Sequence, residues 1–117
     1  MIIEKFLSTP KDQLKDQPIY QVSFIAQYKA GDDDAFNKMF AAMYELAFAE
    51  FNCIGMYNAT NEQGFEIALT YWHSMEDINR WKSDSRHQMA QQNGKEKWYD
   101  DYVITIAKIT NQYCKIH

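Results

Sequence analysis

Four stretches of the chain are predicted to form β-strands, and in the first and third of them side chains of different character alternate between two faces. The stretches are residues 19–28, 53–60, 65–72 and 102–110. Residues 61–64 separate the second stretch from the third, and a short polar segment that ends in glycine is typical of a hairpin loop. The sequence therefore predicts four strands, of which the middle two form a hairpin.

Between the first two strands, apolar side chains recur at steps of three and four, which is typical of a helix that buries one face. This helix is expected from about Asp34 to Glu50, after the acidic residues 32–34 that suit a helix start. A second helical region is expected after the third strand, because Ser74 is a good N-cap with Asp77 three residues later.

The second helical region is expected to consist of two pieces. Asp84 or Ser85 starts the later piece, which should stop at Gly94 because glycine commonly ends helices. Trp98 and Tyr99 are then expected in a short turn before the closing strand.

The predicted order of strand, helix, strand, strand, helix, strand defines an α+β fold of the ferredoxin-like βαββαβ type. Its four strands form an antiparallel sheet, and the helices can cover only one face of it. Both faces of the first strand nevertheless carry sizeable apolar groups, with Ile19 and Ile25 on one side and Val22 and Phe24 on the other. We therefore expect a homodimer in which the second subunit covers the remaining face.

The chain is expected to form one domain with a short extension at each end. Its 117 residues suffice for a core without support from a disulfide or a metal. Residues 1–18, which contain Pro10 and Pro18, are interpreted as an N-terminal arm, residues 19–110 as the domain and residues 111–117 as a C-terminal tail.

Composition argues against several classes of partner. The net charge of −4 does not favour nucleic-acid binding, which depends on clustered Lys and Arg. No apolar run is long enough for a membrane span, and no signal peptide is recognisable. Cys53 and Cys114 have no spacing that indicates a disulfide or a metal site, so a cytoplasmic location with reduced thiols is expected.

A group of aromatic and polar residues in the second half of the chain carries a family resemblance. These residues are Tyr71-Trp72, Trp81, His87, Ala90-Gln91-Gln92-Asn93-Gly94 and Trp98-Tyr99. Over residues 18–110 the chain resembles the antibiotic-biosynthesis-monooxygenase superfamily, and in particular a little-characterised bacterial branch of it. The resemblance implies a ferredoxin-like domain that dimerises into an α/β barrel.

The resemblance also implies a range of activities. Members of the superfamily include oxygenases that act on phenolic polyketides without metal or flavin, enzymes that degrade haem, and isomerases. The haem-degrading members have an Asn on the first strand, a Trp on the helix after the third strand and a His ten residues later. Here the first strand has no Asn and Trp81 matches the helical Trp, but Gln91 stands ten residues later and His87 only six.

Candidate site residues follow from what a cofactor-free oxygenase requires, namely a flat apolar site, help with a phenolic proton and exclusion of water. His87 is the candidate base, and Arg80 or Arg86 could stabilise developing negative charge. Both Trp81 and His87 also suit purely structural roles, in a helix stripe and near a helix end. Flat walls for an aromatic substrate are expected from Trp72, Trp81, Trp98 and Tyr99.

Three functions are compatible with these residues. The first is a monooxygenase that acts on a small, flat, hydrophobic or aromatic molecule without a metal or a tightly held cofactor, in a pocket near Trp81, His87 and Trp98. The second is a dimeric ligand-binding or stress-response module that performs no chemistry. The third is a haem-binding or haem-degrading protein with His87 as the iron ligand.

Overall fold

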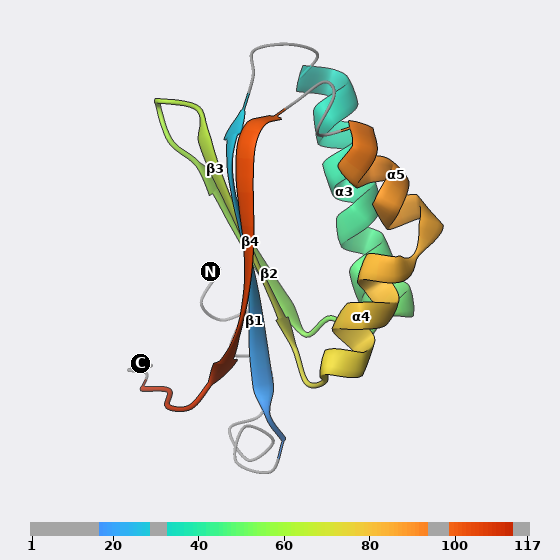
Figure 1. Ribbon diagram of the computed structural model, residues 1–117, viewed down its shortest axis with the longest axis vertical. Coiled ribbons are helices and arrows are strands. Elements are labelled where there is room, and N and C mark those ends of the chain that lie inside the picture. Colours follow the sequence, from blue (N-terminus) through green and yellow to red (C-terminus); the bar gives the residue numbers. More distant parts are fainter. Residues whose placement is uncertain (1–16, 29–32, 94–98, 114–117) are drawn as a thin grey trace.

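The computed structural model describes residues 17–28, 33–93 and 99–113. Four strands form one antiparallel sheet with the order β2-β3-β1-β4, and three helices pack beside it (Figure 1). The predicted α+β, ferredoxin-like arrangement is therefore confirmed. Along the chain the elements are β1 (Ile19–Tyr28), α3 (Asp33–Glu50), β2 (Gly55–Thr60), β3 (Phe65–Trp72), α4 (Met75–Ser83), α5 (Ser85–Asn93) and β4 (Tyr99–Ile109).

The closing strand differs most from the prediction, because β4 begins at Tyr99 and not at Tyr102. Tyr99 pairs with Tyr28 while Asp101 pairs with Gln27, so Asp100 is an extra residue in a β-bulge. The bulge lets Tyr99 and Tyr102 reach the same cavity although they are three residues apart. It also interrupts the two-residue alternation from which the strand was predicted, and the expected turn at Tyr99 was therefore wrong.

The described helices α3, α4 and α5 all cover one face of the sheet (Figure 1). Ser74 caps α4 as predicted, since its side-chain oxygen accepts a hydrogen bond from the backbone N–H of Asp77 at 3.0 Å. The core lies between the helices and the sheet. One cluster of buried residues in it consists of Val22, Leu46, Ala47, Phe51, Cys53, Trp72 and Ile78.

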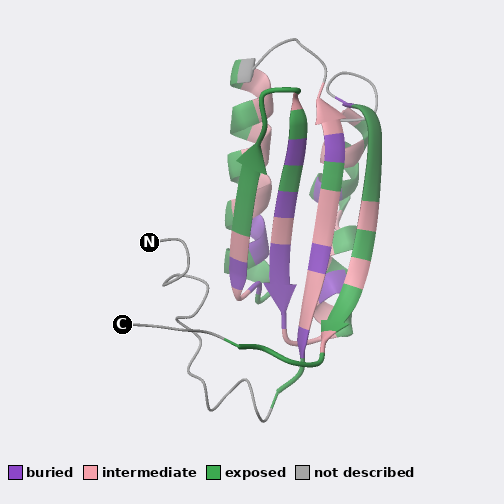
Figure 2. Ribbon diagram, turned by 90° about the vertical axis from the view of Figure 1, so that its left-hand side faces the viewer, coloured by how far each residue is buried: buried purple, intermediate pink, exposed green. Residues whose placement is uncertain are grey.

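The opposite face of the sheet is covered by none of the described residues. Figure 2 looks onto this open face. Apolar residues of three neighbouring strands form a row across it. Ile25 of β1 pairs with Ile67 of β3 on one side and with Val103 of β4 on the other. All three are exposed, as are Tyr57 and Phe65. Antiparallel sheets that leave one face in water normally present polar residues there.

The ends of the chain lie largely outside the described residues. This applies to most of the predicted arm (1–18) and to part of the predicted tail (111–117). The expected helix stop at Gly94, within the chain, also lies outside the described residues. Among the helices that the structure describes, none is long and apolar enough to cross a membrane.

Candidate functional site

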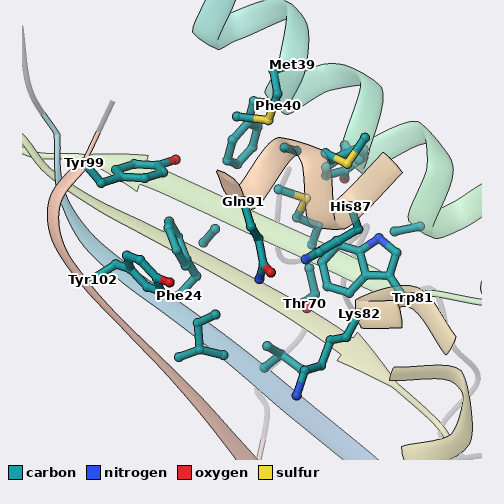
Figure 3. A pocket seen from close by; sticks show the side chains of 18 residues that line it. Phe24, Met39, Phe40, Thr70, Trp81, Lys82, His87, Gln91, Tyr99 and Tyr102 are labelled. Atoms are coloured by element: carbon teal, nitrogen blue, oxygen red, sulfur yellow. The ribbon is translucent and has the colours of Figure 1, made fainter. Parts of the chain in front are cut away.

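A cavity of about 130 Å³ lies between the helices and the sheet. Figure 3 shows aromatic, methionine and aliphatic side chains around it, with few polar groups among them. Tyr99 and Tyr102 stand toward one end of the cavity, Trp81 and His87 toward the other, and Gln91 projects between them. A site of this kind, mostly apolar with a few polar groups, is typical of small-molecule binding.

Helical periodicity brings the upper wall of the cavity together. Met39, Phe40 and Met43 of α3 lie within one turn and face the sheet. His87 and Gln91 of α5 are four residues apart and therefore share one face of that helix. The sheet supplies the floor, including Phe24 and Thr70, because alternate residues of each strand point toward the helices.

Asp84 forms the corner that places Trp81 close to His87. Its backbone N–H donates to the carbonyl of Trp81 at 3.2 Å, which ends α4. Its carboxylate accepts a hydrogen bond from the backbone N–H of Arg86 at 2.8 Å, which caps α5. Hydrogen bonds from the Arg86 side chain lower the pKa of Asp84 to about 2, so this cap stays charged. Two helices that meet at one residue thus bring together side chains six positions apart.

His87 is buried against Trp81, with ring centroids 4.1 Å apart and an angle of 73° between the ring planes. Burial lowers the pKa of His87 to about 4, while Asp84 acts weakly in the opposite direction. The imidazole is therefore neutral at physiological pH. Two buried atoms, Nδ1 of His87 and Nε1 of Trp81, have no hydrogen-bond partner among the described residues.

A second polar group, the carboxyl group of Glu66, lies near Tyr99 at one end of the cavity. Tyr99 packs edge-on against Phe24 with ring centroids 5.1 Å apart, and it interacts electrostatically with Glu66. Burial raises the pKa of Tyr99, and Glu66 adds to the rise. Glu66 is only 2% exposed, and burial raises its pKa to about 7. Its Oε2 has no hydrogen-bond partner among the described residues.

The structure brings three of the predicted site residues together, because Trp81, His87 and Tyr99 all line the cavity. Trp72 does not line it. This side chain is fully buried behind Trp81, with ring centroids 5.1 Å apart, and its Nε1 donates to the hydroxyl of Thr70 at 2.9 Å. Trp98 lies outside the described residues.

The two predicted arginines lie on the outer surface and do not line the cavity. Arg80 forms an ion pair with Asp77 at 3.4 Å and lies over the ring of Phe51. Arg86 bridges Asp84 and Glu50, and so ties the corner between α4 and α5 to the end of α3. These contacts are structural, and they leave Lys82 as the cationic side chain that lines the cavity.

Sequence reasoning missed Lys82, Gln91, Tyr102 and Glu66. Gln91 could have been found, since it is four residues from His87 on a predicted helix. Tyr102 could also have been found, because it shares a strand face with Ile104, which lines the cavity. Among the described residues no three His, Cys, Asp or Glu side chains gather as a metal site would require.

No model of a protein family matches the chain. Uncharacterized protein YqjZ of Bacillus subtilis strain 168 is 28% identical over 96 residues, which cover 82% of this chain and 84% of that protein. Jasmonate monooxygenase ABM of Pyricularia oryzae is 26% identical over 54 residues, which cover 46% of this chain and 25% of that protein.

Solved structures share the fold at low sequence identity. A candidate antibiotic biosynthesis monooxygenase from Caulobacter crescentus CB15 has a TM-score of 0.70 at 14% identity, over 81% of this chain and 92% of that one. Hydroxynitrile lyase from Passiflora edulis has a TM-score of 0.65 at 13% identity, over 82% of this chain and 97% of that one. The chain has the fold of the antibiotic biosynthesis monooxygenases, and the predicted resemblance is confirmed. A lyase on the same fold means that the fold alone does not fix the reaction.

Proposed function

We propose that the protein is a monooxygenase of the antibiotic-biosynthesis type that oxidises a small aromatic molecule in the cavity between helices and sheet. The observation that carries this proposal is a neutral, buried imidazole, His87, in a cavity otherwise walled mainly by apolar side chains. Such a site holds a flat ring, excludes water and offers a polar group that can contact a substrate oxygen. The relatives named as monooxygenases support the reaction class.

The size of the cavity favours one aromatic ring. An engineered cavity of roughly 150 Å³ binds benzene, and this one measures about 130 Å³. Haem has several times the volume of a single ring, and this difference favours the smaller molecule as the ligand. We therefore propose a monocyclic phenol, in preference to haem, as the substrate. Lys82 and Tyr102 lie at the mouth of the cavity, because both line it and are exposed.

The proposed reaction balances without a bound cofactor. A phenol and dioxygen give a quinone and water: one oxygen atom becomes the new carbonyl and the other leaves as water. The substrate supplies all the electrons, so no external reductant is needed. Loss of the phenolic proton makes the ring electron-rich enough to react with oxygen, and contact between His87 and the substrate oxygen supports that step.

Oxygen consumption with a panel of monocyclic phenols and hydroquinones tests the function. The His87→Ala variant should lose about 100-fold in rate relative to the wild type, the lower end of what one positioned proton-transfer or hydrogen-bonding group contributes. His73→Ala is the matched control. His73 hydrogen-bonds the carbonyl of Pro18 at 3.0 Å, does not line the cavity, and should leave the rate unchanged. Saturable phenol binding with no oxygen uptake would instead indicate a binding module without chemistry.

We also propose that the protein is a homodimer in which the open face of the sheet of each subunit covers that of the other. The row formed by Val103, Ile25 and Ile67 supports this, because exposed apolar patches of this kind mark interfaces. Ile67→Lys should convert the dimer to a monomer of 13.8 kDa in light scattering coupled to gel filtration. Met89→Lys is the control, since Met89 is 68% exposed on α5 and away from the sheet. An unchanged mass for Ile67→Lys would contradict the proposed interface.

A further inference from the structure

Two buried polar atoms beside the cavity each need a partner. Nε1 of Trp81 and Nδ1 of His87 are both buried, and neither has a hydrogen-bond partner among the described residues. Leaving such atoms unpaired is costly, and native proteins rarely do so. The indole nitrogen can only donate a hydrogen bond, whereas an imidazole nitrogen can either donate or accept.

The contact between the two rings leaves one complementary arrangement. The ring centroids are 4.1 Å apart, and Figure 3 shows the indole nitrogen on the side of Trp81 that faces His87. If Nδ1 of His87 carries no proton, it can accept from the indole N–H once the rings turn about the last side-chain torsion, which is soft in both residues. If Nδ1 carries the proton, two N–H donors are buried together and neither is satisfied.

The same pairing fixes what His87 presents to the cavity. The neutral ring has one proton, so an unprotonated Nδ1 places that proton on Nε2. Figure 3 shows the far end of the ring directed toward Gln91 and the space between the two ends of the cavity. The nearby charges oppose one another, since Asp84 favours the imidazolium and Lys82 disfavours it, and burial outweighs both.

We propose that Trp81 holds His87 in the Nε2–H tautomer, so that His87 is a hydrogen-bond donor in the cavity and the ligand presents an acceptor oxygen there. The chemical class is then a carbonyl, a quinone or a phenolate. A neutral phenol that has to give its proton to His87 is not in this class. The inference rests on the proposed function only in taking this cavity as the ligand site.

The proposal changes the role of His87 from the one predicted from sequence. A donor at this position stabilises the phenolate that reacts with oxygen, or the carbonyl of the quinone product, and does not itself remove the proton. Gln91 stands beside His87 and can add a second hydrogen bond through its side-chain amide. Trp81 is thus a positioning residue that acts through His87.

Nitrogen-15 NMR of the wild-type chain tests the tautomer directly. The His87 ring should show a pyrrole-type Nε2 and a pyridine-type Nδ1 near neutral pH, assigned by comparison with His87→Leu. Trp81→Phe removes the indole donor and should shift the ring toward a mixture of tautomers. Trp72→Phe is the control, because the Trp72 N–H already donates to Thr70 and its loss should leave the tautomer unchanged. A pyridine-type Nε2 in the wild type would overturn the proposal.

Ligand binding gives a second readout, and its first comparison uses the wild type alone. Acetophenone and α-methylstyrene have nearly the same shape, but only acetophenone has an acceptor oxygen. One hydrogen bond from His87 should make acetophenone bind about five- to tenfold more tightly to the wild type. The preference should vanish in His87→Leu and persist in His73→Leu. Equal affinities for the wild type would contradict the proposal.

The two proposals can fail separately. A protein that prefers acetophenone and has the Nε2–H tautomer, but consumes no oxygen with any phenol, retains this inference and loses the monooxygenase function. A protein that oxidises phenols with His87 in the other tautomer retains the function, restores His87 as a base and loses this inference.

Discussion

Replacing Glu66 with glutamine should stabilise the protein at pH 8 and have little effect at pH 4.5. Glu66 is 2% exposed, and burial raises its pKa from 4.5 to about 7. Between these values the folded state keeps a proton that the unfolded state has lost, so stability falls as the pH rises and the full penalty is present above pH 7. A pKa change of this size corresponds to about 3 kcal/mol. Glutamine keeps the shape of the side chain but cannot ionise.

Urea unfolding at the two pH values measures this effect. The expected gain at pH 8 is about 2 to 3 kcal/mol, because the buried amide of glutamine carries a smaller desolvation cost of its own. Glu62→Gln is the matched control, since Glu62 is exposed in the loop between β2 and β3 and should change nothing. An equal gain at both pH values would show that the carboxyl group is not the source of the pH dependence.

Among the residues that the structure describes, Glu66 has no counter-charge, which is unusual for a buried acid beside a candidate site. Glu66 interacts electrostatically with Tyr99, which lines the cavity. Proteins retain destabilising groups where function benefits from them, and perturbed pKa values concentrate at such places. If Glu66→Gln is more stable but changes the pH profile of oxygen uptake, the carboxyl group serves the reaction. If it leaves the profile unchanged, its effect is confined to stability.

The fold could be predicted from sequence because its periodicities are regular. The helix stripe at Phe36, Phe40 and Met43 and the alternation in β1 each indicate one kind of element over many residues. The start of β4 could not be predicted, because a bulge at Asp100 changes the period within the strand.

Alternation along the strands predicted where the strands lie, but it did not predict which face of the sheet the helices cover. In β3 the apolar residues Phe65 and Ile67 lie on the open face, whereas Glu66 points toward the helices and is buried. Burial depends on which elements pack across the sheet, and these elements lie far apart in sequence. The inverted pattern itself supports a partner on the open face, since it leaves the apolar side of β3 in water.

Residue type identified part of the candidate site, and partners distant in the sequence decided the rest. His87, Trp81 and Tyr99 were predicted from their chemistry and the family resemblance, and all three line the cavity. Arg86 was predicted from its charge alone, but its ion pair with Glu50 joins residues 36 positions apart and holds it on the outer surface. No local pattern in the sequence indicates such a pair.

The two tryptophans that contact each other should differ sharply when each is replaced by alanine. Trp72 is fully buried and does not line the cavity, so Trp72→Ala should cost about 3 to 5 kcal/mol of unfolding free energy. Its loss also leaves the hydroxyl of Thr70 without the indole donor. A domain whose total stability is of order 5 to 15 kcal/mol is then close to unfolding at room temperature.

Trp81 is half-buried and borders an existing cavity, so Trp81→Ala enlarges that cavity and should cost clearly less stability than Trp72→Ala. Guanidinium unfolding followed by circular dichroism measures both variants, and phenol or acetophenone affinity gives the second readout. We expect Trp72→Ala to lose much stability and to keep its ligand affinity where it remains folded. Trp81→Ala should lose less stability and should bind the ligand more weakly. A stability loss in Trp81→Ala larger than that in Trp72→Ala would make Trp81 a core residue and remove it from the binding site. A side chain that mainly supports the core contributes to ligand binding only through the fold.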